Sequence, residues 1–363
     1  MPGREPLRTR LGPRGTGPDV RAEGGPAGDE RAALEAVAEA VRLVGAGLVN
    51  VEGAAGWSPA ALLSLARRSW KLVVSLHDFA LFCPRPHLVE EPVARFCGYS
   101  RDAERCAACL AATWSLPAPF LEEWRRGSAE LLAAADAVVY SSAFLRSRHA
   151  ELFPGPRSGP ERVIEPPASG AEGGDGAPPT RPIGLEGPAR VAFVGAYRPH
   201  KGALVFDELL LRSESGGRPL LWTVLGGGDP ALLRQARRRG ARIGGYYRSG
   251  SLVRRLREGE VDLALLLSVW PETYSLTLTE CRAAGVPVVA FDHGAISDRI
   301  SAEGGGVTVP LEEGARGVEA VLGEVLTGRR AIPAFRGGPP GATARAAAAE
   351  RERLYRALRR GDA

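Results

Sequence analysis

The chain has 363 residues, of which 44% are hydrophobic and 25% are charged, and its formal net charge is +5. This length suffices for about two domains, each with its own core. No basic stretch is interleaved with aromatic residues, so the charge indicates an arginine-rich composition rather than a nucleic-acid-binding protein, and contact with an anionic membrane is a second interpretation.

Residues 1–29 are rich in Gly, Pro and Arg and lack apolar periodicity, which predicts a disordered tail. The tail has no apolar stretch of the kind that a signal peptide needs, and no apolar run in the chain reaches the length of a membrane span. We therefore expect a cytoplasmic protein, or one attached to the inner face of the membrane.

Residues 30–167 alternate helical and strand patterns, which predicts an N-terminal domain with a parallel sheet. One strand delivers His77 and Asp78 at its carboxyl end, where open α/β sheets bind ligands. A helix is expected to begin at Ser58 and Pro59, because a capping hydroxyl precedes a proline at the first helical position. The predicted elements are helices at 30–44, 58–68 and 119–134 and strands at 48–51, 71–76 and 137–140.

A cysteine-rich insertion is predicted at residues 83–109 within this domain. It contains Cys83, Cys97, Cys106 and Cys109. The last two have the short spacing of structural zinc sites, and four thiolates would complete a tetrahedral site. Buried free thiols are a second interpretation, and a disulfide is a third that a reducing compartment disfavours.

Residues 168–188 are rich in Gly and Pro without periodicity, which predicts a linker and a domain boundary. A second domain is expected at 189–342, and a C-terminal helix at 343–363. The predicted strands of the second domain begin near residues 191, 221, 241, 261 and 286.

Residues 270–299 hold the most informative pattern, with Glu272 and Glu280 on either side of a polar turn that leads into a helix ending at Gly285. A helix that begins there aims free backbone N–H groups and the positive end of its dipole at a ligand, as phosphate sites do. Carboxylates beside it would accept hydrogen bonds from sugar hydroxyls. The pattern therefore predicts a sugar-nucleotide site.

These residues resemble the donor site of family 4 retaining glycosyltransferases. The resemblance lies in Glu272, seven residues, Glu280 and then the run Ala-Gly-Val-Pro-Val-Val. Upstream, residues 191–202 resemble the strand and loop that open the donor domain of that family. The resemblance is close over residues 191–310 and looser over residues 48–167.

The resemblance implies an α/β protein of the GT-B fold, with two Rossmann-like parallel-sheet domains that face a central cleft. The N-terminal domain would be abridged, because the strand and Gly-rich loop with which that domain usually starts do not precede Glu30. The helix at 343–363 would cross back to the N-terminal domain.

By resemblance, Glu280 would hold ribose hydroxyls, Glu272 would hold a hydroxyl of the transferred sugar, and Lys201 would neutralise charge on the departing diphosphate. Where the family usually has an arginine, this chain has Ala196, and Arg198 is the nearby substitute. The phosphates would lie on backbone N–H groups at the helix start. The implied donor-binding residues are Gly195, Arg198, Lys201, Glu272, Ser275, Leu276, Thr277 and Glu280.

His77 resembles the histidine with which the family's acceptor domain faces the donor sugar, and a purely structural histidine is the alternative. The implied catalytic residues are His77, Lys201 and Glu272. In the family's usual scheme the acceptor attacks on the face that the diphosphate leaves, and the leaving phosphate takes the proton. This scheme retains configuration without a catalytic metal, and it does not require the two glutamates to act as a glycosidase pair.

The expected function is transfer of a hexose from a UDP-, GDP- or dTDP-sugar to a glycan, a lipid-linked sugar or a small molecule, as in bacterial polysaccharide synthesis. The abridged domain and Ala196 favour an alternative, a degenerate module that binds a nucleotide sugar or a partner subunit without turnover. A sugar-nucleotide epimerase would need further acid and base residues, which we do not identify. No cofactor is expected for catalysis, and structural zinc is the candidate metal.

Overall fold

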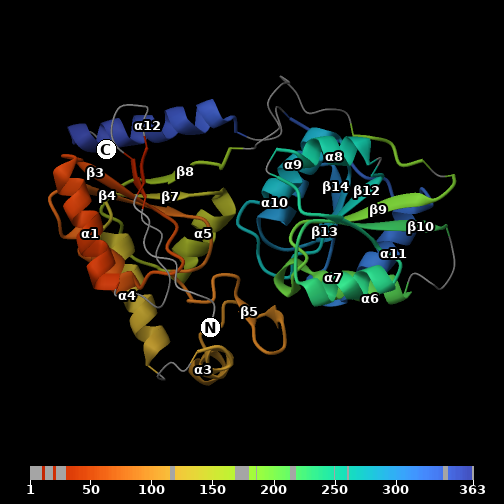
Figure 1. Cartoon of the computed structure of the whole chain (residues 1–363), viewed down its shortest axis with the longest axis horizontal. Helices are drawn as coiled ribbons and strands as arrows, with labels where there is room; N and C mark the ends of the chain where they lie inside the picture. The colour runs from red at the N-terminus through yellow and green to blue at the C-terminus, as the bar shows by residue number, and fades with distance from the viewer. Residues whose placement is uncertain are drawn as a thin grey trace. The chain divides into compact units, whose positions relative to one another are not determined.

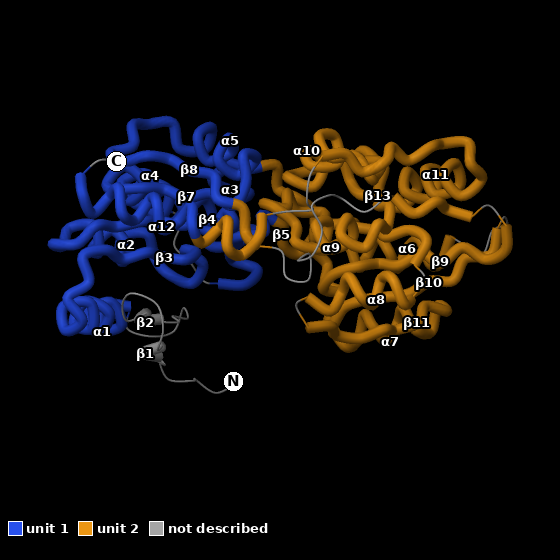
Figure 2. The backbone as a smooth tube through the Cα atoms, turned by 90° about the horizontal axis from the view of Figure 1, so that it is seen from above, with its two compact units in different colours: residues 1–88, 99–164, 349–363 blue, residues 89–98, 165–348 orange. Residues whose placement is uncertain are grey.

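The computed structural model forms two compact units, each built on a parallel β-sheet with helices packed against it (Figures 1 and 2). Unit 1 comprises residues 1–88, 99–164 and 349–363, and unit 2 comprises residues 89–98 and 165–348. The structure describes residues 10–12, 19–21, 30–114, 119–167, 180–184, 186–212, 218–248, 250–259, 261–337 and 342–361.

Unit 1 is built on a four-stranded sheet in the order β3-β4-β7-β8, in which all neighbours are parallel. Its two central strands are buried except at Lys71, as expected for apolar strands covered on both faces. Glu52 lies opposite Ser75, so the carboxyl ends of β3 and β4 share one edge. The strands are β3 (Leu48–Glu52), β4 (Lys71–Leu76), β7 (Ala137–Tyr140) and β8 (Glu161–Val163).

The helices of unit 1 begin where local sequence signals predict. Ser58 Oγ accepts a hydrogen bond from Ala61 N at 3.2 Å, with Pro59 at the first helical position. Ser142 caps the helix after β7 in the same way. The helices are α1 (Glu30–Leu43), α2 (Pro59–Ala66), α3 (Ala103–Ala111), α4 (Phe120–Ala134), α5 (Ala143–Leu152) and the greater part of α12 (Ala344–Arg360).

Two segments differ from the predicted domain organisation. The insertion at 83–109 does not stay with one unit, because residues 89–98, with the antiparallel pair β5 (Val89–Glu90) and β6 (Arg95–Phe96), group with unit 2. Within the predicted disordered tail, β1 (Arg10–Gly12) pairs with β2 (Asp19–Arg21), and the other residues of 1–29 lie outside the described part of the chain.

Unit 2 is built on a six-stranded parallel sheet in the order β11-β10-β9-β12-β13-β14 (Figure 1). The chain starts in the middle, proceeds outward to β11 and then returns to β12 on the other side of β9. This reversal makes the carboxyl ends of β9 and β12 a topological switch point, where doubly wound sheets bind ligands. The strands are β9 (Ala189–Val194), β10 (Leu220–Leu225), β11 (Arg242–Gly245), β12 (Leu263–Leu266), β13 (Val288–Phe291) and β14 (Gly306–Val309).

Each face of this sheet carries its own buried cluster. Successive residues of β9 alternate between the two clusters, with Phe193 in one and Val194 in the other, as the period of two in a strand requires. The helical segments are η1 (Pro199–Lys201), α6 (Ala203–Arg212), α7 (Pro230–Arg238), α8 (Leu252–Glu258), α9 (Leu276–Ala284), α10 (Gly294–Glu303), η3 (Leu311–Glu313) and α11 (Gly314–Leu326).

The predicted linker at 168–188 is only partly described, because residues 168–179 and 185 lie outside the described part. Its later residues are attached to unit 2: Thr180 Oγ accepts from Phe335 N at 2.7 Å, and Arg181 N donates to Gly285 O at 2.8 Å. No helix in the described ranges is long and apolar enough to cross a membrane.

Candidate functional site

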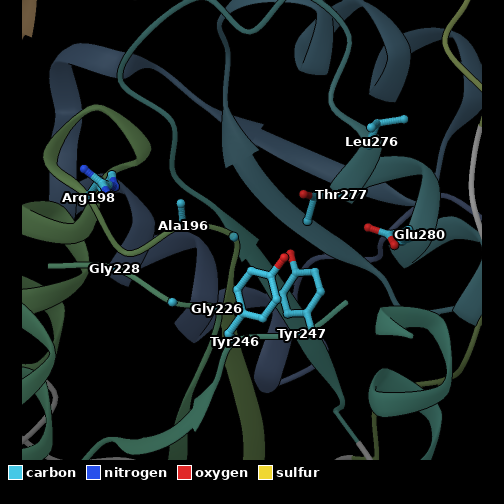
Figure 3. Close-up of a pocket in the computed structure, with 11 residues that line it drawn as sticks. Ala196, Arg198, Gly226, Gly228, Tyr246, Tyr247, Leu276, Thr277 and Glu280 are labelled. Atoms are coloured by element: carbon cyan, nitrogen blue, oxygen red, sulfur yellow. The ribbon is translucent and has the colours of Figure 1, made fainter. Parts of the chain in front are cut away.

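A pocket of about 550 Å³ lies at the carboxyl ends of the central strands of unit 2 (Figure 3). Its walls come from the loops that follow β9, β10 and β11 and from the start of α9, so it occupies the switch point of the sheet. The lining residues are Gly195, Ala196, Arg198, Gly226, Gly227, Gly228, Tyr246, Tyr247, Leu276, Thr277 and Glu280.

One wall of the pocket is backbone, because β9 and β10 are each followed directly by a glycine. Gly195 and Gly226 have φ angles of 131° and 151°, which other residues rarely adopt. A Cβ atom at Gly226 would overlap the carbonyl oxygen of Gly195. These two loops therefore lie close together without side chains, which leaves space above the strand ends for a ligand to approach the main chain.

The opposite wall is the first turn of α9. Ser275 has a φ of 70°, and its Oγ accepts from Leu278 N at 3.3 Å. Arg299 Nη1 donates to Ser275 O at 3.0 Å, which fixes the loop before the helix. Within the part of the chain that the structure describes, the N–H groups of Leu276 and Thr277 have no hydrogen-bond acceptor. Such N–H groups, together with the helix dipole, favour an anion.

Glu280 lies in the same helix, and its carboxyl group is directed into the pocket beside Thr277 (Figure 3). The residue is only 7% exposed. Burial raises the pKa of Glu280 to about 7, although the backbone N–H of Gly250 partly opposes the rise. The carboxyl group is thus poised between neutral and charged forms, and ligand hydroxyls that donate to it would favour the charged form.

Two tyrosines that follow β11 form a further wall. Their rings are stacked, with centroids 6.4 Å apart and planes at 17°. Tyr246 is 79% exposed, whereas Tyr247 lies nearer to Thr277 and Glu280 (Figure 3). Burial and the neighbouring Glu280 raise the pKa of Tyr247. An exposed aromatic ring beside a pocket offers a stacking surface for a planar ligand group.

Lys201 and Glu272 pair with each other next to the start of α9. Lys201 Nζ lies 2.7 Å from Glu272 Oε1 and 5.1 Å from the centre of the Trp270 ring. Ser268 Oγ donates to the same carboxylate oxygen. Burial alone would raise the pKa of Glu272, but the charge and hydrogen bond of Lys201 outweigh it and lower the pKa below its ordinary value.

Five of the predicted donor-binding residues line the pocket: Gly195, Arg198, Leu276, Thr277 and Glu280. Ser275 is the cap of α9, and the remaining two form the ion pair described above. Arg198 borders the pocket beside Ala196, and no carboxylate within the described ranges pairs with its guanidinium.

His77 belongs to unit 1 rather than to the unit that holds these residues. Its Nε2 lies 3.1 Å from Glu52 Oε1. The neighbouring Asp78 turns away from this contact, because its Oδ1 accepts from Ala80 N at 2.8 Å. Burial raises the pKa of Asp78.

The cysteines are reduced, and four of them are partly exposed. Cys83, Cys106 and Cys109 belong to unit 1 and Cys97 to unit 2. Among the described residues, no three His, Cys, Asp or Glu side chains are grouped as a metal site. Arg125 interacts electrostatically with Cys83 and Cys106. The zinc site stays a prediction, which metal analysis of protein purified without chelators would test.

Sequence reasoning missed several residues of these sites, among them the lining glycines of the loop after β10, Ser268, two tyrosines, Glu52 and Arg351. Tyr246 and Tyr247 directly follow the predicted strand near 241, and aromatic residues at that edge could have been flagged. Glu52 directly follows the predicted strand at 48–51, so the shared edge of neighbouring parallel strands could have found it. Arg351 carries no local signal, since it reaches Glu52 from a helix near the end of the chain.

No family model and no curated protein matches this chain. Solved structures do resemble it. A sucrose-phosphate synthase from Thermosynechococcus elongatus aligns with a TM-score of 0.57 at 15% identity, covering 90% of this chain and 77% of that one. Anabaena Alr3699/HepE in complex with UDP and glucose aligns with a TM-score of 0.53 at 15% identity, covering 82% and 75%. A glycosyltransferase from Rickettsia africae ESF-5 aligns with a TM-score of 0.52 at 14% identity, covering 84% of this chain and 76% of that one.

These neighbours are GT-B glycosyltransferases, and at such identities the likeness establishes the fold. The sequence prediction of two Rossmann-like parallel-sheet domains is therefore confirmed: the chain has the GT-B fold.

Proposed function

We propose that the protein transfers a sugar from a nucleotide-diphosphate donor to a hydroxyl acceptor, and that the donor binds in the pocket of unit 2. One observation carries this proposal: a single pocket combines N–H groups of a helix start that have no acceptor among the described residues, a buried carboxyl group and an exposed aromatic ring. A nucleotide diphosphate needs these three features, for its phosphates, its ribose and its base respectively. The neighbour that was crystallised with UDP and glucose makes UDP-sugars the first donors to test.

The phosphates are assigned to the N–H groups of Leu276 and Thr277 and to Arg198. Arg198 compensates for Ala196, because its guanidinium borders the same pocket and is not engaged by a carboxylate in the described part of the chain. The ribose hydroxyls are assigned to Glu280 and the base to the exposed ring of Tyr246. Gly195 and Gly226 allow the diphosphate to approach the main chain closely.

Lys201 and Glu272 are assigned to the reacting end of the donor. Glu272 Oε1 accepts from both Lys201 and Ser268, and no donor in the described ranges occupies its Oε2. That oxygen would accept a hydroxyl of the transferred sugar, while Lys201 neutralises charge on the departing diphosphate. The ion pair fixes the orientation of both groups before the donor arrives, and it lowers the pKa of Glu272 below its ordinary value.

In the proposed reaction the acceptor oxygen forms a bond to the anomeric carbon while the bond from that carbon to the diphosphate oxygen breaks. The acceptor proton passes to the leaving phosphate. Attack on the face that the diphosphate leaves retains configuration, and no protein nucleophile or metal takes part. His77 of unit 1 is assigned a contact with a substrate hydroxyl. The acceptor is a glycan, a lipid-linked sugar or a small molecule.

A degenerate module that binds a nucleotide sugar without turnover is the second candidate. Ala196 favours it, because the family's arginine is missing at that position. The mutual pairing of Lys201 and Glu272 also favours it, since each offsets the charge of the other.

Binding calorimetry with UDP-, GDP- and dTDP-sugars, followed by assays of donor hydrolysis, separates the candidates. We expect saturable binding of at least one donor, which Glu280→Ala abolishes. Glu258→Ala, at an exposed position of α8 in the same unit, is the matched control and should bind normally. Binding without hydrolysis or transfer would favour the degenerate module. Equal binding by the Glu280→Ala variant would refute the donor site.

A further inference from the structure

The carboxyl edge of the unit 1 sheet carries a hydrogen-bonded network centred on Glu52. Glu52 ends β3 and His77 follows β4, and these parallel neighbours place both side chains at one edge. Glu52 Oε1 lies 3.1 Å from His77 Nε2. Asn50 Nδ2 donates to Glu52 Oε2 at 2.5 Å. Each oxygen of the Glu52 carboxylate therefore has a hydrogen-bond partner at this edge of the sheet.

The C-terminal helix α12 adds a cation to this network. Arg351 donates to both oxygens of Glu52, with Nη1 3.0 Å from Oε2 and Nη2 3.0 Å from Oε1. Its Nη1 also lies 3.3 Å from Ser75 Oγ, which in turn donates to Asn50 Oδ1 at 2.9 Å. A two-pronged guanidinium contact fixes the plane of a carboxylate, which a single-point cation does not do.

The electrostatics keep Glu52 charged. Burial alone would raise the pKa of Glu52, but hydrogen bonds from His77 and Asn50 and the charge of Arg351 lower it below its ordinary value. A charged, oriented carboxylate is an acceptor only, so the ring nitrogen that faces it carries a hydrogen.

We propose that Glu52 and Arg351 are positioning residues for His77: Arg351 orients Glu52, and Glu52 holds the imidazole with a hydrogen on Nε2, which fixes the orientation of the ring toward a substrate hydroxyl. The inference rests on the proposed glycosyl transfer, which supplies that hydroxyl. Helix α12 would take part in the reaction through the contact of Arg351 with Glu52, which lies within unit 1. His77, whose side chain is 36% exposed, touches substrate, whereas Glu52 and Arg351 act through it.

The network could instead serve only to attach α12 to the sheet. In that case, loss of the Glu52 charge would not change which nitrogen of the His77 ring carries hydrogen. Nitrogen-15 spectra of the histidine rings in the full chain separate the two roles, with His77 assigned through the His77→Gln variant. The positioning role predicts hydrogen on Nε2 in the unsubstituted protein. Glu52→Leu and Glu52→Ala should both produce a mixture of tautomers, and Arg351→Ala should produce a smaller change in the same direction.

Glu352→Ala is the matched control, because Glu352 lies next to Arg351 in the same helix but pairs with Arg356 at the surface. It should leave the His77 spectrum unchanged. If Glu52→Ala fails to fold, Glu52→Leu decides, because its side chain has a similar size and can neither accept from Nε2 nor donate to it. An unchanged His77 tautomer in Glu52→Leu, with the protein folded, would overturn the proposal.

Kinetics with a donor that the unsubstituted protein turns over provide the second readout. Glu52→Leu and Arg351→Ala should lower kcat roughly 10- to 100-fold, as misorientation of a contact group does, with the donor KM within about twofold. Normal kcat in a variant that has lost the tautomer would refute the positioning role. If no donor is turned over by the unsubstituted protein, the proposed function fails, and the ring spectra still decide whether Glu52 controls His77.

Discussion

In unit 2 the neighbouring strands β9 and β10 are each followed by glycine, whereas in unit 1 the neighbouring strands β3 and β4 carry Glu52 and His77 at or directly after their last residues. Gly195 and Gly226 leave main chain exposed to a pocket, and the N–H groups of Leu276 and Thr277 face it without an acceptor in the described part of the chain. In unit 1, Glu52 is already hydrogen-bonded to the ring of His77 and to Arg351 of the distant helix α12.

The difference indicates two uses of the same edge of a parallel sheet. Exposed main chain and unpaired donors suit a large anion, because binding satisfies groups that otherwise lack partners. A network that the chain has completed by itself suits the orientation of a single side chain. Substitutions at the edge of unit 2 test this difference.

The largest effect is expected where the exposed edge of unit 2 is blocked. In Gly226→Ala the new Cβ meets the carbonyl of Gly195 at a φ of 151°, so we expect a loss of about 4 kcal/mol in unfolding free energy and no donor binding. Urea unfolding measures the change in unfolding free energy, and calorimetry measures donor binding. Gly323→Ala, in α11 with no atom near the added carbon, is the control and should gain about 0.5–1 kcal/mol. A stable Gly226→Ala protein that binds donor would contradict the description of this edge.

Burial of Glu280 sets a pH dependence. Its pKa is raised from 4.5 to about 7, so the folded protein holds this proton more tightly than the unfolded chain. The associated stability is present below pH 4.5 and is lost as the pH rises through about 7, by on the order of 3 kcal/mol. Denaturation at a series of pH values should show this slope, which Glu280→Gln should remove.

Donor binding should have the opposite pH dependence. Ribose hydroxyls donate to the charged carboxylate, so affinity for a UDP-sugar should increase as the pH rises through about 7. Calorimetry at several pH values measures it. An affinity that is flat across this range in the unsubstituted protein would exclude Glu280 as the ribose contact.

The Lys201–Glu272 pair comes next in expected effect. Lys201→Met leaves a buried carboxylate without its cation, so we expect a loss of about 2 kcal/mol in stability and about a 100-fold fall in kcat. Adding Glu272→Gln should recover much of the stability but none of the activity. Recovery of activity in the double variant would show that the charge of Lys201 has no role in transfer.

The smallest effect is expected at the aromatic wall. Tyr246→Ala removes an exposed ring, so stability should stay unchanged while donor affinity falls by about 1 kcal/mol. Leu221→Ala, at another exposed apolar position of unit 2, should change neither quantity appreciably. Equal donor affinities of the two variants would refute the assignment of the base to Tyr246.

Local patterns predicted most of the scaffold of unit 2. Buried parallel strands are continuous apolar runs, and the helix that starts after Ser275 has a capping hydroxyl and ends at Gly285, so each element is encoded within its own segment. The placement of Glu280 in a helix beside a phosphate-type N-terminus follows from the same local signals.

Local sequence patterns could not predict the long-range contacts that define the sites. Lys201 pairs with Glu272 across 71 positions, and Arg351 reaches Glu52 across 299. Such partners are selected by the packing of whole elements, because each carboxylate accepts the cation that the fold brings within reach. The grouping of residues 89–98 with unit 2 has the same origin, since no pattern within the insertion indicates it.

The central claim is that the phosphates of a nucleotide-diphosphate sugar bind at the start of α9 in unit 2. Amide spectra of the full chain during titration with UDP-, GDP- and dTDP-glucose test it most directly, with the corresponding nucleosides as controls. We predict saturable shifts of the Leu276 and Thr277 amides with at least one donor and none at those amides with its nucleoside. Saturable donor binding that leaves both amides unshifted, or no binding by any donor, would contradict the claim.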